Sequence, residues 1–386
     1  MSQAGIYFDS FSHSSKRFAE TAKHGIDPLG FRKHVTHVAP IYPKKLELSN
    51  EGTAAFGSEV IYKFPTSGYV HHVVIKNYLA QTTTEKYCPI TGAGMIESIK
   101  LECDGNTIMD YKYAPVFQYY LSKLNSEEAR DKCLLAAGNG QDSTAAAIYT
   151  CVPIPMFFDP IMCPGISPLN LSKFKKAPEL KITYRTLANS IVATSTGGSI
   201  TSSKMLLYMS ESTPTQKRSH NEQDYWYNSI DFYTNEGNTV ATATATNIDV
   251  SGMSGQIKKQ LVIARLSSDV TANTYFSNKE IGALKLDLDG HIEDIFKQKE
   301  EGEIDYIIYN QGRGYQSTLG YPYVIPNVHF VDKNYATNNL SGLHSAKINK
   351  HQINVTHALG ANGDVSVLGI RSAIYKHMEG TMERFI

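Results

Sequence analysis

The 386-residue chain carries little charge, and neither sign is in excess. Its 37 Lys and Arg residues balance 37 Asp and Glu residues, and only 19% of the residues are charged, whereas soluble domains average about 25%. Binding to nucleic acid without regard to sequence requires a surplus of Lys and Arg that displaces counterions from the phosphates. We therefore expect neither a coating of nucleic acid nor specific nucleic-acid binding.

Signals for membrane insertion, secretion and disulfide formation are missing as well. The longest apolar stretch, 144–166, contains four prolines, whereas a membrane-spanning helix needs about 20 apolar residues without such breaks. The first residues show no basic segment followed by an apolar run, so we expect folding in the cytosol. The five cysteines form no C-x-x-C pair, and we expect them to behave as small apolar residues.

Short segments rich in β-branched and aromatic residues dominate the chain. They recur between clusters of Gly, Pro, Asn and Asp, which is typical of an all-β protein. The main exception is 115–137, where apolar residues have helical spacing and Asn125 forms a capping pair with Glu128. We predict one or two short helices there and a further helix at 15–24.

The beginning of the chain and two internal stretches differ in composition from the strand-rich segments. Residues 1–45 carry seven Lys and Arg against three Asp and Glu, a net charge of +4. We interpret them as an N-terminal arm, either a solvated terminus or an element that docks on a neighbouring subunit or an anionic surface. Residues 194–203 and 238–255 are low in complexity and are expected to be loops, although the second could pair as a strand. The polar segment 210–220 predicts a domain boundary near residue 215.

The most informative feature is an internal repeat. The segment 96–105 (IESIKLECDG) returns as 281–290 (IGALKLDLDG), with five of ten positions identical. In both copies apolar side chains alternate with mostly charged ones, which predicts a strand with one core face that runs into an Asp-Gly turn. Four further pairs of segments keep the same order: 73–75 with 261–263, 152–155 with 323–326, 170–172 with 339–341, and 180–184 with 353–357. A tandem duplication of an all-β unit, roughly 45–212 and 225–378, explains this order.

A unit of about 160 residues with many short strands suits an eight-stranded jelly roll, in which two antiparallel sheets bury alternating residues. We predict an all-β chain of two tandem eight-stranded jelly rolls (a double jelly roll) with a few short helices. The predicted division is an N-terminal arm (1–44), a first jelly roll (45–214), a second jelly roll (215–378, with a linker at 215–255) and a C-terminal tail (379–386).

In this organisation the chain resembles the double jelly-roll major capsid proteins of tailless icosahedral viruses, the lineage that includes the tectiviruses. The likeness extends over nearly the whole chain. Its most specific local feature is the block 149–159 (YTCVPIPMFFD), followed by 164–171 (PGISPLNL) and the strand 179–185. Proteins of this lineage similarly carry a strand that ends in a Pro/aromatic segment, a loop with an apolar Pro-Leu element, and a return strand.

The resemblance implies a viral structural protein that forms a homotrimer of pseudo-hexagonal outline and tiles an icosahedral virion shell through contacts between trimers. It implies a virion location after assembly in the host cytoplasm, with vertex and minor capsid proteins as further partners. The basic N-terminal arm is expected to contact an internal viral membrane or a neighbouring trimer. No enzymatic activity is expected.

Patterns for catalysis, cofactors and metals are missing or incomplete. The glycine-rich pieces 91–94, 138–140 and 312–314 lack the P-loop spacing and are interpreted as turns. The adjacent His71 and His72 point to opposite faces of a strand, which makes shared metal ligation unfavourable. His34 and His37 have no identifiable partners in the sequence, and an acidic group lacks a complete calcium loop: Asp287, Asp289, Glu293 and Asp294.

Two other functions fit a tandem jelly roll. One is a receptor- or glycan-binding spike or lectin, for which Trp226, between Tyr225 and Tyr227, is the best candidate for an exposed aromatic patch. The other is a duplicated cupin-type metalloenzyme, but the chain has no H-x-H pair and no Gly-x-Ser-x-Gly elbow. We therefore predict no catalytic, cofactor-binding or metal-binding residue and no cofactor.

Overall fold

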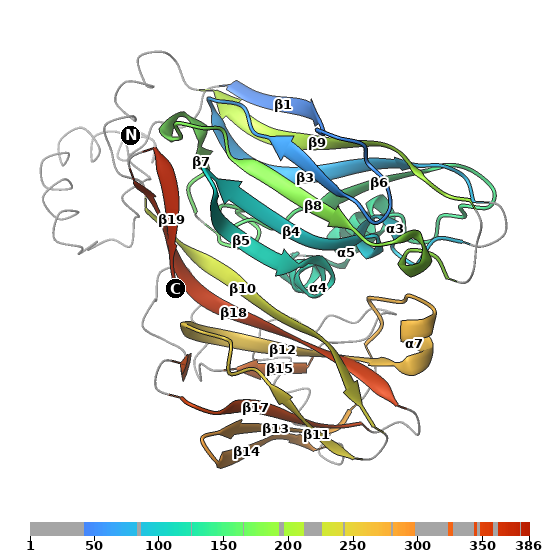
Figure 1. Ribbon diagram of the computed structural model, residues 1–386, viewed down its shortest axis with the longest axis vertical. Coiled ribbons are helices and arrows are strands. Elements are labelled where there is room, and N and C mark those ends of the chain that lie inside the picture. Colours follow the sequence, from blue (N-terminus) through green and yellow to red (C-terminus); the bar gives the residue numbers. More distant parts are fainter. Residues whose placement is uncertain are drawn as a thin grey trace, which may run out of the picture.

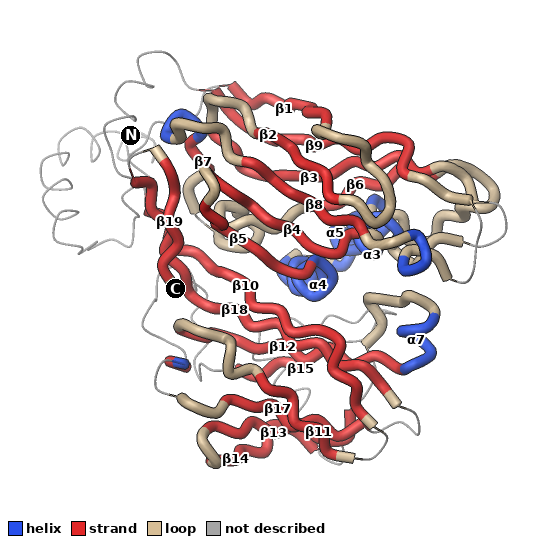
Figure 2. Tube along the Cα trace, viewed as in Figure 1, coloured by secondary structure: helices blue, strands red, loops and turns tan. Residues whose placement is uncertain are grey.

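The structure of the protein is a computed structural model that shows mostly strands and a few short helices (Figures 1 and 2). It describes residues 42–82, 86–124, 126–164, 166–192, 197–211, 226–241, 244–278, 281–297, 323–326, 343–345, 348–357, 362–378 and 380–386. Strand and helix counts below refer to these residues. The predicted helix at 15–24, nearly all of the predicted N-terminal arm and the predicted boundary near residue 215 lie outside them.

The first half of the described chain forms two antiparallel sheets around one core. Its strands are β1 (Tyr42–Ser49), β2 (Glu59–Lys63), β3 (Tyr69–Leu79), β4 (Ile96–Cys103), β5 (Asn106–Lys112), β6 (Ile148–Pro153), β7 (Leu169–Asn170), β8 (Glu179–Tyr184) and β9 (Ile200–Glu211). One sheet has the order β1-β9-β3-β6, with β7 paired to β3, and the other has the order β2-β8-β4-β5.

The second half repeats this arrangement. Its strands are β10 (Trp226–Val240), β11 (Ala245–Asp249), β12 (Gln256–Leu266), β13 (Ile281–Leu288), β14 (His291–Lys297), β15 (Tyr323–Pro326), β16 (Leu343–His344), β17 (His351–His357), β18 (Gly363–Met378) and β19 (Thr381–Phe385). One sheet has the order β10-β18-β12-β15, with β16 paired to β12 and β19 to β18, and the other has the order β11-β17-β13-β14.

Both halves therefore have the same jelly-roll topology. If the two-residue strands β7 and β16 are set aside, the first, eighth, third and sixth strands of each half form one sheet, and the second, seventh, fourth and fifth form the other. Even the short strands correspond, because β7 and β16 each pair with the third strand of their own half. The predicted all-β fold of two tandem jelly rolls with a few short helices is confirmed.

The helices lie in the connections between strands. They are α3 (Thr91–Gly94), α4 (Tyr113–Lys123), α5 (Glu127–Ala136) and α7 (Ser267–Thr271), with the short 3₁₀ turns η2 (Leu171–Lys173) and η3 (Leu187–Asn189). Helices α4 and α5 confirm the helical pattern at 115–137. Asn125 lies outside the described residues, and the cap that α5 has is the Ser126 side chain, which accepts a hydrogen bond from the Ala129 amide at 3.1 Å.

The internal repeat occupies equivalent strands, down to their irregularities. The segments 96–105 and 281–290 form β4 and β13 with their turns, and each strand has a bulge at its start where it pairs with the seventh strand of its roll. The register also corresponds, since Lys100 lies opposite Lys181 and its counterpart Lys285 lies opposite Asn354. Both Asp-Gly turns have two residues with positive φ, 48° and 84° in the first copy and 52° and 90° in the second, as tight two-residue hairpins require.

Both low-complexity segments were expected to be loops, which is wrong for part of 194–203, whereas the alternative left open for 238–255, pairing as a strand, is confirmed for part of it. Residues 200–203 begin β9, where Ser203 is buried. Its hydroxyl is satisfied by hydrogen bonds to Asn77 at 2.6 Å and to the Tyr184 hydroxyl at 2.8 Å. Residues 238–240 end β10, and 245–249 form β11, whose Ile248 is buried in the second core. Thr and Val favour extended backbone even in a simple sequence, and these residues gain cross-strand partners. Strands β10 and β11 thus lie within the predicted linker 215–255, and β19 lies within the predicted tail 379–386.

The hairpin turns allow a test of the duplication. In the first turn, a Cβ on Gly105 would meet no atom within 4 Å. A substitution there therefore causes no steric clash, and its cost comes from the backbone conformation alone. Gly105→Ala should lower the free energy of unfolding by about 1 kcal/mol because alanine avoids positive φ. Gly105→Asn should cost less, since asparagine tolerates this conformation. Gly290→Ala and Gly290→Asn should give the same order in urea titrations, and equal effects of Ala and Asn would contradict the turn geometry.

Candidate functional site between the two jelly rolls

The two rolls share one continuous hydrophobic core. In Figure 1, β10 and β18 of the second roll lie next to β5 and α4 of the first. The core of the first roll extends without a break into the second roll through a set of buried residues: Tyr227, Ile230, Phe232, Leu261, Phe276, Leu368, Ile370, Ala373, Tyr375 and Met382. A separate cluster fills the second roll itself. The junction is therefore a packed interior and not a contact between two exposed surfaces.

The sheet β10-β18-β12 faces both cores at once. On β18, Val365 and Val367 belong to the cluster inside the second roll, whereas Leu368 and Ile370 belong to the cluster shared with the first roll. The first eleven residues of β18 and the first nine of β12 are buried without interruption. Strands that are covered on both faces show such continuous burial. This sheet is thus the middle layer between the two rolls.

Aromatic side chains fill the centre of the junction. Phe157, from the segment after β6, stacks on Tyr375 of β18 with ring centroids 4.0 Å apart and an angle of 17° between the planes, and it meets Tyr227 edge-on at 5.3 Å. The Ser229 hydroxyl donates a hydrogen bond to the carbonyl of Phe157. Phe157 lies in the Pro/aromatic block 149–159, so the block that carried the sequence resemblance takes part in the contact between the rolls.

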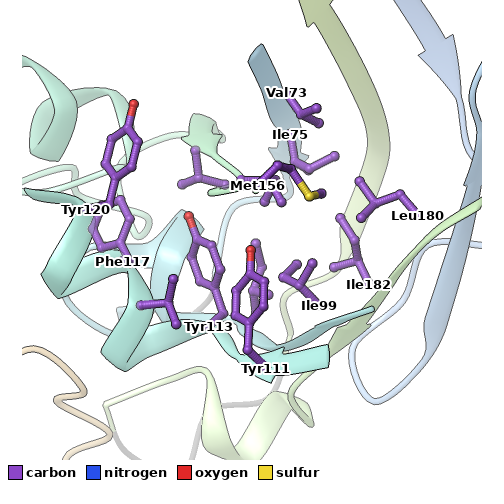
Figure 3. Close-up of a cluster of buried hydrophobic side chains, with 14 of the residues drawn as sticks. Val73, Ile75, Ile99, Tyr111, Tyr113, Phe117, Tyr120, Met156, Leu180 and Ile182 are labelled. Atoms are coloured by element: carbon purple, nitrogen blue, oxygen red, sulfur yellow. The ribbon is translucent and has the colours of Figure 1, made fainter. Parts of the chain in front are cut away.

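Helix α4 and the end of β5 present further aromatic residues to both rolls. Tyr111 meets Phe232 of the second roll edge-on at 5.3 Å, and Phe117 meets Phe276 in the same way at 5.5 Å. Tyr111 also donates a hydrogen bond to the carbonyl of Pro155 at 2.7 Å, near Met156 at the centre of Figure 3. Burial raises the pKa of Tyr111 well above its ordinary value, so its hydroxyl stays a neutral donor.

A buried charge network lies next to this aromatic centre. Asp231 of β10 accepts hydrogen bonds from Arg371 Nε at 3.0 Å and Nη2 at 2.6 Å, and from Arg384 Nη1 at 3.2 Å. Arg371 also donates to the carbonyl of Ser254 at 3.1 Å. Because Asp231 and Arg371 are both buried, each charge depends on the other for compensation. The network joins β10, β18 and β19 on the sheet that contacts the first roll.

The residues considered as ligands or catalysts do not come together. His71 bonds the Ser210 hydroxyl, whereas His72 Nδ1 bonds Asp159 at 2.8 Å, so the adjacent histidines have different partners. Asp287 pairs with Lys350 at 2.6 Å, and Asp289 instead accepts from backbone amides of residues 349 and 350. Glu293, Asp294 and Trp226 lie in described strands, but their side chains lie outside the description, as do His34 and His37 entirely.

The described glycine-rich pieces lie in turns, and the cysteines form no disulfide. Thr91–Gly94 is the single helical turn α3, and both Gly138 and Gly140 have positive φ in a turn, while 312–314 lie outside the described residues. All five cysteines are free, and three of them are buried. No group of three or more His, Cys, Asp or Glu side chains within the described residues could hold a metal ion. No described helix combines the length and the apolar character that crossing a bilayer demands.

The comparisons with known proteins identify the fold. No family model and no curated protein matches the sequence. Among solved structures, a chain of the PBCV-1 virus capsid is similar with a TM-score of 0.66 and 13% identity, covering 89% of this chain and 96% of that chain. The Faustovirus major capsid protein has a TM-score of 0.64 and 9% identity, covering 95% and 98%. The mavirus major capsid protein has a TM-score of 0.56 and 10% identity, covering 94% and 92%. The chain has the double jelly-roll fold of these proteins, and the resemblance is confirmed at the level of fold.

The stacked pair Phe157 and Tyr375 should couple the two rolls energetically. We expect Phe157→Leu and Tyr375→Leu each to destabilise the protein, and the double variant to lose about 1 kcal/mol less than the sum of the single losses, which is typical of stacked aromatic pairs. Ile292→Ala, on an exposed residue of β14, is the control and should be additive with Phe157→Leu. Strict additivity of the aromatic pair in urea denaturation would contradict the contact.

Loss of the buried carboxylate of Asp231 should lower the free energy of unfolding far more than loss of an exposed carboxylate. Asp231→Asn leaves Arg371 and Arg384 without a compensating charge and should lower the free energy of unfolding by about 3 kcal/mol or more. The control is Glu128→Gln, which removes an exposed pair with Lys132 and should cost at most about 0.5 kcal/mol. Thermal and urea denaturation would measure both, and a similar small loss for the two variants would show that Asp231 is not buried among these arginines.

Proposed function

We propose that this chain is a major capsid protein, which assembles as homotrimers of pseudo-hexagonal outline and tiles an icosahedral virion shell. The observation that carries the proposal is the shared core between two rolls of identical topology. A shell subunit must keep its shape under contact from several neighbours at once. A junction built from Phe157, Tyr375 and the Asp231 network supplies that rigidity, whereas a flexible linker between rolls would not.

Symmetry explains why two similar rolls in one chain are useful. Three copies of a chain with two rolls present six similar sandwiches around a threefold axis, which gives an outline close to a hexagon. Hexagonal outlines pack into a continuous layer, so one protein can contact many neighbours through similar edges. The two rolls differ in the length of their connections: 185–199 join the seventh and eighth strands of the first roll, whereas only 358–362 join those of the second. This difference would distinguish the edges of the proposed trimer.

The remaining parts of the proposal concern location and partners. The protein would reside in the virion after assembly in the host cytoplasm, and its main partner would be other copies of itself. The basic N-terminal arm would contact an internal membrane or a neighbouring trimer, where anionic lipid or protein surfaces attract Lys and Arg. Vertex and minor capsid proteins would close the shell. The protein would act by self-association and not by catalysis.

The oligomeric state tests the proposal directly. Size-exclusion chromatography with light scattering on the full chain should give a particle of three 42.8 kDa chains, about 128 kDa. A series of protein concentrations distinguishes a stable trimer, whose mass stays constant, from weak association. Negative-stain images of the trimer fraction should show hexagonal outlines.

Two outcomes would contradict the capsid proposal. A protein that stays monomeric at high concentration would rule out a stable trimer as the building block. Binding of such a monomer to immobilised glycans would instead support the spike or lectin alternative. A dimer or tetramer of constant mass would also overturn the proposal, because neither can produce the sixfold arrangement of rolls.

A further inference from the structure

A cavity of about 350 Å³ lies at the seam between the two rolls. The first roll contributes Lys112, at the end of β5, and Arg185, just after β8. The second roll contributes Glu236, Arg265, Tyr275 and Ser366. The cavity is thus formed by both rolls, and the aromatic residues around Phe157 are not among its lining residues. Three of its lining side chains are cations, although the chain as a whole has no net charge.

Two of these cations are already compensated by carboxylates. Lys112 Nζ pairs with Glu97 at 2.7 Å, and Arg265 pairs with Asp364 of β18. The pKa of Glu97 is lowered chiefly by its hydrogen bond from Lys112, with a smaller contribution from the charge of Arg185. Arg265 uses one end of its guanidinium for Asp364, and the planar group has five N–H donors in all.

The third cation, Arg185, has no carboxylate within ion-pair distance among the described residues. Its guanidinium instead lies 4.0 Å from the centre of the Tyr275 ring, and that of Arg265 lies 5.4 Å from the same ring. The Nε of Arg185 is buried and has no hydrogen-bond partner in the described part of the chain. A buried donor without a partner is costly unless something else binds it. Tyr275 therefore holds two guanidinium groups close to one cavity, and that of Arg185 has no carboxylate within ion-pair distance among the described residues.

Glu236 is the acidic member of the cavity, and it too has no ion-pair or hydrogen-bond partner among the described residues. Burial raises the pKa of Glu236, an effect that Arg185, Lys112 and Arg265 oppose and Asp364 reinforces. A neutral carboxyl can donate a hydrogen bond to an anion, whereas an ionised one repels it. The lining thus offers a guanidinium without an ion-pair partner, spare donors on Arg265, the Ser366 hydroxyl and a carboxyl whose pKa burial raises.

We propose that this cavity binds a small phosphate-type oxyanion, which bridges Arg185 of the first roll and Arg265 of the second. The planar guanidinium groups match the geometry of phosphate and sulfate oxygens and bind them with strong, charge-assisted hydrogen bonds. The volume is sufficient for such an ion with several waters, since a water molecule occupies about 30 Å³. Because the ion would contact both rolls, its binding would stabilise the junction in proportion to its concentration.

The site predicts a specific pH dependence. The groups that face the ion are Glu236 and Tyr275, the cations already named, and the carboxylates Glu97 and Asp364 behind them. Glu236 is neutral below its raised pKa and becomes ionised as the pH rises through it. Anion affinity should therefore increase as the pH falls from about 7.5 to about 5. Sulfate is the suitable probe for this series because its own charge stays constant over that range.

Calorimetric titration of the full-length protein with sulfate and with inorganic phosphate, at constant ionic strength, tests the proposal. R185Q should weaken binding of both ions about tenfold or more, because it removes a charged donor. E236Q should tighten sulfate binding at pH 7.5 about threefold or more and should abolish the increase on acidification. K132Q changes an exposed lysine of α5 and should leave the affinity unchanged.

The outcomes separate a built site from general charge effects. If sulfate binds the wild type and R185Q equally, or if K132Q weakens binding as much as R185Q, the cavity is not the site. If R185Q proves unstable, E236Q still tests whether the cavity is the anion site. Its expected effect is tighter binding, which a merely destabilising substitution would not produce. The absence of any saturable binding to the wild type at millimolar concentrations would also overturn the proposal. The test does not depend on trimer formation, so it stands or falls separately from the capsid function.

Discussion

One sheet of this protein, β10-β18-β12, is covered on both faces, and the arrangement of the two rolls depends on it. A jelly roll normally buries one face of each sheet and leaves the other to solvent. In the second roll, Val365 and Val367 fill the interior, while Leu368 and Ile370 on the same strand pack against the first roll. The orientation of the rolls is therefore fixed by apolar burial, the largest favourable term in folding.

A sheet between two cores must also accommodate polar side chains that an ordinary roll would expose. Asp231 and Arg371 lie directly opposite each other on β10 and β18, and Arg384 of β19 completes the network. Such a network gives less stability than apolar packing would, but it penalises any shift of register that would separate the charges. The aromatic contact supplies affinity between the rolls, and the charge network supplies a single alignment of the strands that form it.

Alternation and turn chemistry, which are local properties, made much of the fold predictable. The repeated pattern at 96–105 and 281–290 encodes a strand with one core face and a hairpin turn. Each copy pairs with the seventh strand of its own roll, and the two registers are equivalent. The junction was not predictable in the same way. Asp231 and Arg371 are 140 residues apart in the sequence, and neither has a local pattern that marks it as buried. Phe157 was singled out only as part of a block that resembles other proteins. Strand β11 was left open as an alternative to a loop, because its small residues gain stability from neighbouring strands and not from their own propensity.

The twist of the sheets accounts for an opening beside the packed junction. Two sandwiches with twisted sheets cannot remain in contact along their full length, because each sheet curves away from the other. The aromatic centre is a region of close contact, whereas the cavity lies where the end of β5 and the residue after β8 face β10, β12 and β18. Charged residues such as Arg185 and Glu236 can occupy that opening, since it retains space for solvent or an ion. A duplicated fold thus produces a tightly packed junction and a polar opening beside it, and the opening is where small solutes can affect how firmly the rolls are held.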